Sequence, residues 1–234
     1  MCFEQSTDAI KGLHEYAAYN QVQKLAENIL RSKRGNVSDM DALVPYESTL
    51  DSKAFSKQTP LMRAFEGDAV FTGEWLFDNG ADICKKSEAV GQGEPPNETI
   101  FHFAAIGNST KVLRLLAHFR NYCPNSKVPL VDEPNSDGNT ALHLSAEEGH
   151  FTITEIFVKH FEADAFIKRK DGITAFHRIA QRGWLKVVKY LAKKNQRINI
   201  KGDTGDTAVD RVQKYCWKGA DCSSVIEYLR TFQN

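Results

Sequence analysis

Apolar residues along this chain recur at the three- and four-residue spacing of short amphipathic helices. One such stripe spans residues 153–157 and another spans 187–191, and each follows a segment that carries small residues such as Ala146. Gly149 stands between the two segments of the first pair, where a left-handed helix end is needed. The pattern predicts pairs of short helices separated by tight turns.

These helix pairs repeat along the chain with a period of about 34 residues. The segment DGNTALHLSAEEGH at 137–150 is matched by DGITAFHRIAQRGW at 171–184. Weaker copies begin at Thr59, Thr99 and Thr207, and a copy nearer the N-terminus is marked only by LHEYAAYN. Each threonine stands where its hydroxyl can cap a helix N-terminus. Such a period indicates a repeat architecture in which each unit buries its apolar face against its neighbours.

The repeated pattern resembles the ankyrin repeat, because TALHLSAEEGH is similar to the family signature T-P-L-H-x-A-A-x-x-G-H. The resemblance implies an all-α fold, an ankyrin-repeat solenoid of about five to six helix–turn–helix units with projecting hairpins and inserted loops. It implies a single domain over residues 1–234. The expected repeat-like units are about 12–45, 59–90, 99–131, 137–170, 171–203 and 204–234. The expected insertions are 31–57, 84–98 and 120–136.

Four histidines, His14, His102, His143 and His177, occupy the same place in their copies, and Met62 stands there in another copy. Helices of adjacent repeats pack about 8–10 Å apart, whereas metal ligands must lie about 2 Å from a shared ion. Equivalent histidines therefore cannot converge on one metal. We expect each imidazole to hydrogen-bond the backbone of a turn, and we expect no metal and no cofactor.

The five cysteines are odd in number and include no C-x-x-C pair. This pattern favours reduced thiols over a disulfide framework. The N-terminus lacks the basic and apolar regions of a secretory signal, and no apolar run is long enough to span a membrane. These features predict a soluble, cytoplasmic protein, or one in a host cytosol if it is a translocated effector.

The sequence carries no Gly-rich phosphate loop and no hydrolase or zinc-protease motif. The enzymatic alternative is a Cys/His site hidden in an irregular segment, 31–57 or 215–223. A nucleophile of that kind needs a base and a third orienting group in one cleft. No local spacing supplies such a set, so the expected function is not enzymatic.

The formal net charge is zero, with 30 basic and 30 acidic residues. Residues 168–201 nevertheless contain eleven basic side chains and one acidic one, whereas residues 132–167 contain eight acidic and one basic. Two interpretations are open: solvated faces that attract one another across a repeat boundary, or a bipolar docking surface for a partner. A nucleic-acid partner is not favoured, because the whole chain lacks a net positive field and interleaved exposed aromatics.

The resemblance implies a non-catalytic scaffold or adaptor that binds a partner protein through first helices, hairpin tips and a concave face. Narrower forms of this interpretation are a bacterial effector directed at a host cell and an inhibitor-of-NF-κB-like regulator. Charged and aromatic side chains at the variable positions are the candidate contacts. They are Arg63, Glu66, Phe103, Leu144, Glu147, Glu148, Lys168, Lys170, Arg178, Gln181, Arg182 and Trp184. Trp217, in the irregular last unit, is a further exposed-aromatic candidate.

Overall fold

The computed structural model of the 234-residue chain describes residue 24 and residues 44–47, 55–89, 96–116, 128–194 and 197–232. The chain divides into two compact units, Met1–Ser136 and Asp137–Asn234. Most of the expected repeat 12–45 lies outside the described residues, as do His14, Cys2, Cys123 and much of the insertion 31–57.

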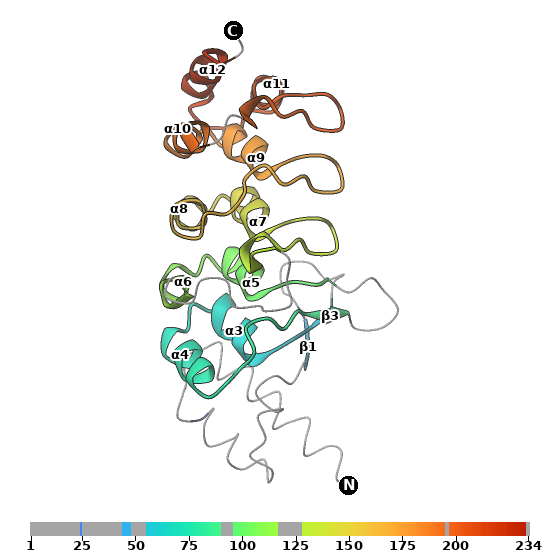
Figure 1. Cartoon of the computed structure of the whole chain (residues 1–234), viewed down its shortest axis with the longest axis vertical. Coiled ribbons are helices and arrows are strands. Elements are labelled where there is room, and N and C mark those ends of the chain that lie inside the picture. The colour runs from blue at the N-terminus through green and yellow to red at the C-terminus, as the bar shows by residue number, and fades with distance from the viewer. Residues whose placement is uncertain are drawn as a thin grey trace. The chain divides into compact units, whose positions relative to one another are not determined.

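Unit 1 contains two helix pairs among its described residues (Figure 1). Helix α3 (Pro60–Glu66) is paired with α4 (Val70–Asp78), and α5 (Ile100–Ile106) with α6 (Thr110–Leu116). Helix α3 packs on α5, and α4 packs on α6. A short 3₁₀ helix spans Leu130–Asp132.

Unit 1 also contains a small antiparallel sheet beside its helices. Its strands are β1 (Val44–Glu47), β2 (Phe55–Gln58) and β3 (Glu88–Ala89), in the order β1-β2-β3. Val44 pairs with Gln58, and Lys57 pairs with Glu88. These strands fall partly in the predicted insertions 31–57 and 84–98, so the sheet is an addition to the helical repeats that the sequence pattern did not indicate.

Unit 2 contains three helix pairs among its described residues: α7 (Ala141–Glu148) with α8 (Phe151–His160), α9 (Ala175–Gln181) with α10 (Leu185–Lys194), and α11 (Ala208–Lys214) with α12 (Cys222–Arg230). Contacts join α7 to α9 and α9 to α11, which form the first-helix row, and join α8 to α10 and α10 to α12, which form the second-helix row. Within this unit, Figure 1 shows long loops projecting beside α7, α9 and α11, on the side away from the second-helix row. The predicted all-α stack of helix–turn–helix units is confirmed.

One local device starts the first helix of every described repeat. This device is a capping box. The backbone N–H of the capping threonine donates to the side chain three residues later, while the threonine hydroxyl is placed to bond that same residue. This arrangement satisfies backbone donors that would otherwise be left free at the helix N-terminus. The pairs are Thr59 with Met62, Thr99 with His102, Thr140 with His143, Thr174 with His177, and Thr207 with Asp210.

The histidines therefore have the role in the turn that their spacing predicted. Nδ1 of His102, His143 and His177 accepts the threonine N–H at 3.1–3.2 Å, so the ring proton belongs on Nε2. Nε2 of His143 then lies 3.3 Å from the carbonyl oxygen of Ile173, in the loop of the next repeat. Each of these imidazoles caps its own helix, and that of His143 also braces its neighbour. The sulfur of Met62 serves as the acceptor in its own copy, at 3.3 Å.

Adjacent repeats in unit 1 approach each other through the turns that follow α3 and α5. A Cβ placed on Gly107 would lie 1.9 Å from the carbonyl oxygen of Glu66, so only glycine fits there. Asp68, in a left-handed conformation with φ 51°, accepts the backbone N–H groups of Lys111 and Val112, both at 2.9 Å. The carboxylate of one repeat thereby caps the second helix of the next.

The core follows the predicted apolar stripes. Ile153 and Phe157 of α8 and Val187, Val188 and Leu191 of α10 are buried. In the last pair, Val225 and Leu229 of α12 are buried as well, which confirms that the weak C-terminal copy has a second helix.

Candidate functional site

The candidate site lies on the first-helix row of unit 2 and on the loop that follows α11. Glu147, at the end of α7, is its first element and lies between two arginines. Its carboxylate oxygens are 3.3 Å from Nη2 of Arg178 on α9 and 3.3 Å from Nη1 of Arg169. The three side chains link α7, the following loop and α9 in one charged network.

Arg169 holds the loop side of this network in place. Its Nε and Nη2 donate to the two carboxylate oxygens of Asp171, each at 2.8 Å, in the two-pronged geometry that favours arginine. Burial raises the pKa of the Asp171 carboxyl, but the hydrogen bonds from Arg169 and the Ile173 backbone, together with the charges of Arg169 and Arg178, outweigh it, so that pKa lies below its usual value of 3.8. The hydrogen bonds to Asp171 raise the pKa of Arg169. Both groups are therefore charged at neutral pH.

Arg182, the residue that ends α9, reaches back to α7. Its guanidinium donates from Nε to the carbonyl oxygen of Ala146 at 3.0 Å and from Nη2 to that of Glu147. These carbonyls belong to the last turn of α7, where a cation is favoured. The other side of the guanidinium lies against the ring of Trp217, with its central carbon 3.6 Å from the ring centroid. Arg182 thus joins α7, α9 and the loop after α11.

The loop after α11 is anchored on the end of α9 through Gln181. The N–H of Trp217 donates to the Gln181 carbonyl oxygen at 3.1 Å, and the Gln181 amide donates to the carbonyl oxygen of Tyr215 at 3.5 Å. Tyr215 and Trp217 are each 48% exposed. Two aromatic rings are therefore presented to solvent on a loop whose backbone is fixed.

A disulfide between Cys216 and Cys222 closes the same loop. The expectation of reduced thiols is wrong for these residues, and also for Cys84, which is disulfide-bonded. The C-x₅-C spacing is not a recognised motif. The pair forms because the chain turns back after α11 and brings Cys216 to the first residue of α12, with the Cα atoms 6.2 Å apart. The cytoplasmic location stays a prediction, and the disulfides count against it because such bonds are rare in the cytosol.

Two of the predicted contact residues are buried. The side chains of Phe103 and Gln181 are each 2% exposed, so Phe103 belongs to the core of unit 1 and Gln181 is an anchor for the loop. Trp184 is half-buried and packs edge-on against Phe151, with ring centroids 5.5 Å apart. None of these three presents an open side chain to a partner.

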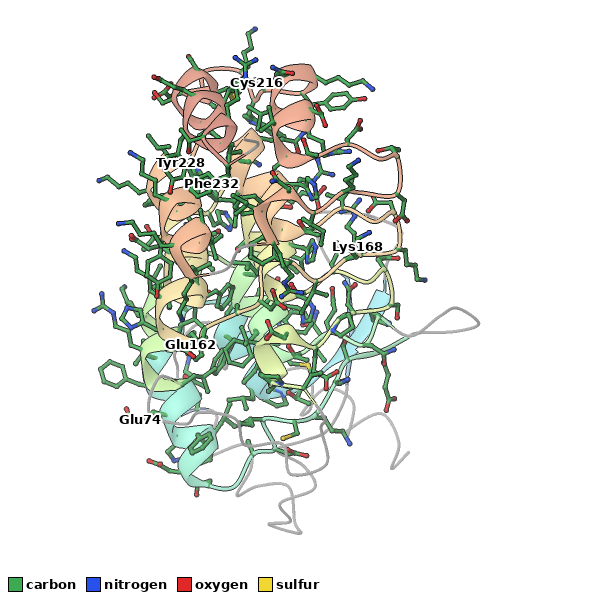
Figure 2. The ribbon with its side chains drawn as sticks, turned by 45° about the horizontal axis from the view of Figure 1, so that its top comes forward. Glu74, Glu162, Lys168, Cys216, Tyr228 and Phe232 are labelled. Carbon is green, nitrogen blue, oxygen red and sulfur yellow. A yellow bond between two sulfur atoms is a disulfide. The ribbon has the colours of Figure 1, made fainter. Side chains whose placement is uncertain are left out.

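The other predicted contacts reach solvent to differing extents. In unit 1, Arg63 and Glu66 form an ion pair on α3. In unit 2, Leu144 is half-buried and Glu148 is exposed, while Lys168 and Lys170 are exposed on the loop before α9. Figure 2 shows Lys168 on the side of the projecting loops and Tyr228 and Phe232 on the opposite side. The structure brings Glu147, Arg178 and Arg182 together.

The acidic and basic segments recognised in the sequence meet as ion pairs. Four bases from residues 168–201 contact acids from residues 132–167, at 2.9 to 3.3 Å. The pairs are Arg169–Glu147, Arg178–Glu147, Lys194–Glu162 and Arg197–Asp164. For these residues the attraction across a repeat boundary is what the structure supports, and exposed pairs of this kind each contribute about 0–1 kcal/mol.

Sequence reasoning missed Tyr215 as part of the site and left Trp217 unplaced. The signal that could have found them is the segment KYCWK at 214–218, in which two aromatic and two basic residues surround a cysteine. It lies in a copy that matches the repeat only weakly. The side chain of Lys214 is exposed, and its Nζ lies 5.1 Å from the centroid of the Tyr215 ring.

The described residues offer little basis for the Cys/His alternative. Cys84, Cys216 and Cys222 are in disulfides, so none of them is a thiolate nucleophile. His102, His143 and His177 are buried with Nδ1 engaged by threonine. Among the residues that the structure describes, no group of three or more His, Cys, Asp or Glu side chains could hold a metal ion.

Comparison with known proteins agrees with the repeat geometry. The chain is similar to the Notch-regulated ankyrin repeat-containing protein of Xenopus laevis, with 31% identity over 100 residues that cover 43% of this chain and 83% of that protein. The chain belongs to the ankyrin-repeat family. The family described as ankyrin repeats (3 copies) matches residues 88–168. Ankyrin repeats generally mediate protein–protein interaction, so this chain has the architecture of a protein-binding module.

Two further relatives are much longer than this chain. The α-latrocrustotoxin-Lt1a of Latrodectus tredecimguttatus is 29% identical over 138 residues, which cover 58% of this chain. The ankyrin repeat and KH domain-containing protein mask-1 of Caenorhabditis elegans is 25% identical over 211 residues, which cover 87% of this chain. This chain spans 9% of the length of the toxin and 7% of that of mask-1.

The helices described here are all short. None of them has both the length and the apolar character needed to cross a membrane.

Proposed function

We propose that this ankyrin-repeat chain is a non-catalytic scaffold that binds a partner protein through the first-helix row of unit 2. The observation that carries the proposal is the charged network around Glu147, which pairs with Arg178 on that row, beside Arg182, which is held by backbone carbonyl oxygens of α7. Side chains held in place before binding lose little conformational entropy when a partner docks. Such a surface suits recognition.

Specificity on this row would come from charge and shape together. Leu144 is half-buried beside this network on α7, and Glu148 is exposed at the end of the same helix. Alternating charges on adjacent repeats fix the register of a partner, because a shift by one repeat would set like charges against each other. A host-directed effector and an inhibitor-of-NF-κB-like regulator would both use such a surface, and no described residue favours either of them.

The test is a pull-down from native lysate with quantitative mass spectrometry. A double variant, Leu144→Ser with Arg178→Glu, changes the first-helix row. The control is Lys186→Glu, which makes the same change in net charge on α10 of the second-helix row. We expect the double variant to lose its specific partner at least tenfold while the control retains it. Retention of the partner by the double variant, with its fold unchanged by circular dichroism, would show that the row is not the binding surface.

A further inference from the structure

The loop after α11 combines exposed aromatic rings with a fixed backbone, which is the composition of a binding anchor. Tyr215 and Trp217 are two of the few large apolar side chains among the described residues that are strongly exposed, at 48% each. Their loop is tied to α9 by the hydrogen bonds of Gln181. Aromatic side chains that are held rigidly contribute contact area at low entropic cost, and they are enriched at the centres of protein interfaces.

Positive charge surrounds these rings. The guanidinium of Arg182 lies over the ring of Trp217. The guanidinium of Arg211 lies 5.5 Å from the centroid of the Tyr215 ring, and the ammonium group of Lys214 lies 5.1 Å from it. Lys218 follows Trp217 in the same loop and is exposed. We call Arg182, Lys214, Tyr215, Trp217 and Lys218 the aromatic–basic corner.

Among the acids near this corner, Glu148 is exposed and its charge acts on Arg182, whereas three others are already engaged. Glu147 contacts Arg169 and Arg178, and Asp206 lies 3.7 Å from Arg211. Asp221 caps α12 by accepting the N–H of Ser224. The corner therefore presents the exposed ammonium groups of Lys214 and Lys218 beside exposed rings.

We propose that the aromatic–basic corner binds an acidic segment of a partner protein, and that the Cys216–Cys222 disulfide holds the corner in its binding form. This rests on the proposed scaffold function and names the chemistry of its partner. Carboxylates of the segment pair with Lys214, Lys218 and the guanidinium groups. An apolar or aromatic side chain of the segment packs on Trp217.

The disulfide has a positional role because one of its cysteines immediately precedes Trp217. Cys216 is covalently tied to Cys222, the first residue of α12, so the segment between them cannot swing away from α9. Reduction by a dithiol transfers two electrons and two protons, opens the bond to two thiols and oxidises the dithiol to its own disulfide. Trp217 is then held without a covalent cross-link, by its backbone bonds to Gln181 and Ala220 and its contact with Arg182.

The experiment uses a phage-displayed library of random 12-residue peptides, selected against the full chain under non-reducing conditions. Enriched peptides are synthesised with a fluorescent label, and their dissociation constants are measured by fluorescence polarisation. We expect the enriched peptides to be rich in Asp and Glu and to contain an apolar residue. We also expect their affinity to fall as salt concentration rises. Enrichment of peptides with no excess of acidic residues would overturn the proposal.

Two variants locate the binding on the corner. Lys214→Glu with Lys218→Glu should weaken the selected acidic peptides at least tenfold, and so should Trp217→Ser. Lys186→Glu with Lys193→Glu makes the same charge change on exposed positions of α10 and should alter affinity less than twofold. Equal weakening by both charge reversals would mean that only net charge matters, and the corner would not be the site.

The disulfide is tested by dithiothreitol and by the Cys216→Ser, Cys222→Ser double variant. Reductant should weaken peptide binding by the wild-type chain at least fivefold, and the double variant should bind as weakly with or without reductant. A double variant that binds as tightly as the oxidised chain would overturn the positional role. Reductant also opens the Cys84 disulfide. If reductant still weakens peptide binding by the double variant, the effect belongs to Cys84 instead.

These outcomes separate this inference from the scaffold function. If the selected peptides bind the Leu144 and Arg178 variant more weakly but bind the corner variants unchanged, the scaffold function stands and the acidic-segment proposal is overturned. Failure to enrich any peptide, together with the absence of a partner in the pull-down, would overturn both.

Discussion

The guanidinium carbon of Arg182 lies 3.6 Å from the centroid of the Trp217 ring, while the same guanidinium hydrogen-bonds two carbonyl oxygens at the end of α7. One side chain therefore bridges three successive repeats of unit 2. A repeat array is stabilised mainly by contacts between nearest neighbours. A side chain that spans three repeats couples the unfolding of the last repeat to that of the first in this unit.

Replacing Arg182 tests this coupling. Arg182→Ala removes two hydrogen bonds from a charged donor and the stacking contact, and we expect unit 2 to lose about 2–3 kcal/mol of unfolding free energy. Arg182→Lys keeps the charge but not the planar fork, so it should lose an intermediate amount. Urea unfolding followed by circular dichroism measures both. If Ala and Lys variants unfold with the wild-type midpoint, the bridge contributes no stability.

Gly107 is predicted to tolerate no side chain. A Cβ there would lie 1.9 Å from the carbonyl oxygen of Glu66, so Gly107→Ala forces the first helices of unit 1 apart, and we expect a loss of about 3 kcal/mol. The matched control is Gly202→Ala, where the nearest atom to the added Cβ is at 3.6 Å. This control should change stability by less than about 1 kcal/mol. Equal effects of the two substitutions in urea unfolding would contradict the close approach.

Asp68 is predicted to contribute a helix cap across a repeat boundary. Its carboxylate accepts the N–H groups of Lys111 and Val112, and loss of such a cap costs about 1 kcal/mol. Asp68→Gly keeps the left-handed backbone but removes the acceptor, so it isolates the cap. Asp68→Asn keeps both the acceptor and the backbone preference and should remain close to wild type. The difference between the two variants in thermal unfolding measures the cap, and no difference would argue against it.

Burial of His177 gives stability a pH dependence. Burial, aided by the positive charges of Arg211 and Lys168, lowers the pKa of His177 from 6.5 to about 4. The folded state therefore binds a proton less readily than the unfolded state. Its contribution is complete above pH 6.5 and is lost as pH falls toward about 4, with a ceiling of about 3 kcal/mol. Below that pH this group adds no further change.

Thermal unfolding of wild type and His177→Gln across this pH range tests the assignment. Glutamine can still close the capping box but does not titrate. The stability of the variant should therefore vary less between pH 6.5 and 4 than that of the wild type. Identical pH profiles would assign the dependence to other groups.

The disulfide pairing predicts a specific peptide map. Trypsin cleaves after Lys214, Lys218 and Arg230, so without reductant the peptides 215–218 and 219–230 should remain linked through Cys216 and Cys222. Reductant should separate them. Titration of the denatured, unreduced chain should find one free thiol among the five cysteines, because Cys84 is also bonded. Unlinked peptides in the unreduced sample would disprove the bond.

The starts of the first helices could be predicted because their cause is local. Thr140 and His143, or Thr174 and His177, are three residues apart, and a capping box forms between residues at that spacing whatever packs around them. The apolar stripes were readable for the same reason, since helical periodicity alone decides which side of α8 or α10 is buried. The sheet of unit 1 could not be predicted in this way, because it pairs short strands from segments with no repeat pattern.

The sequence by itself determined the repeat, its caps and its buried stripes, all of which depend on residues within one or two helical turns of each other. Only the tertiary structure decided that Phe103 is buried, that Cys216 meets Cys222, and that Arg182 stacks on Trp217. Arg182 and Trp217 are separated by a whole helix pair, and Cys216 meets Cys222 only because the loop turns back. Contacts of that kind depend on how successive repeats pack and how the last loop folds, and no spacing of residue types along the chain encodes them.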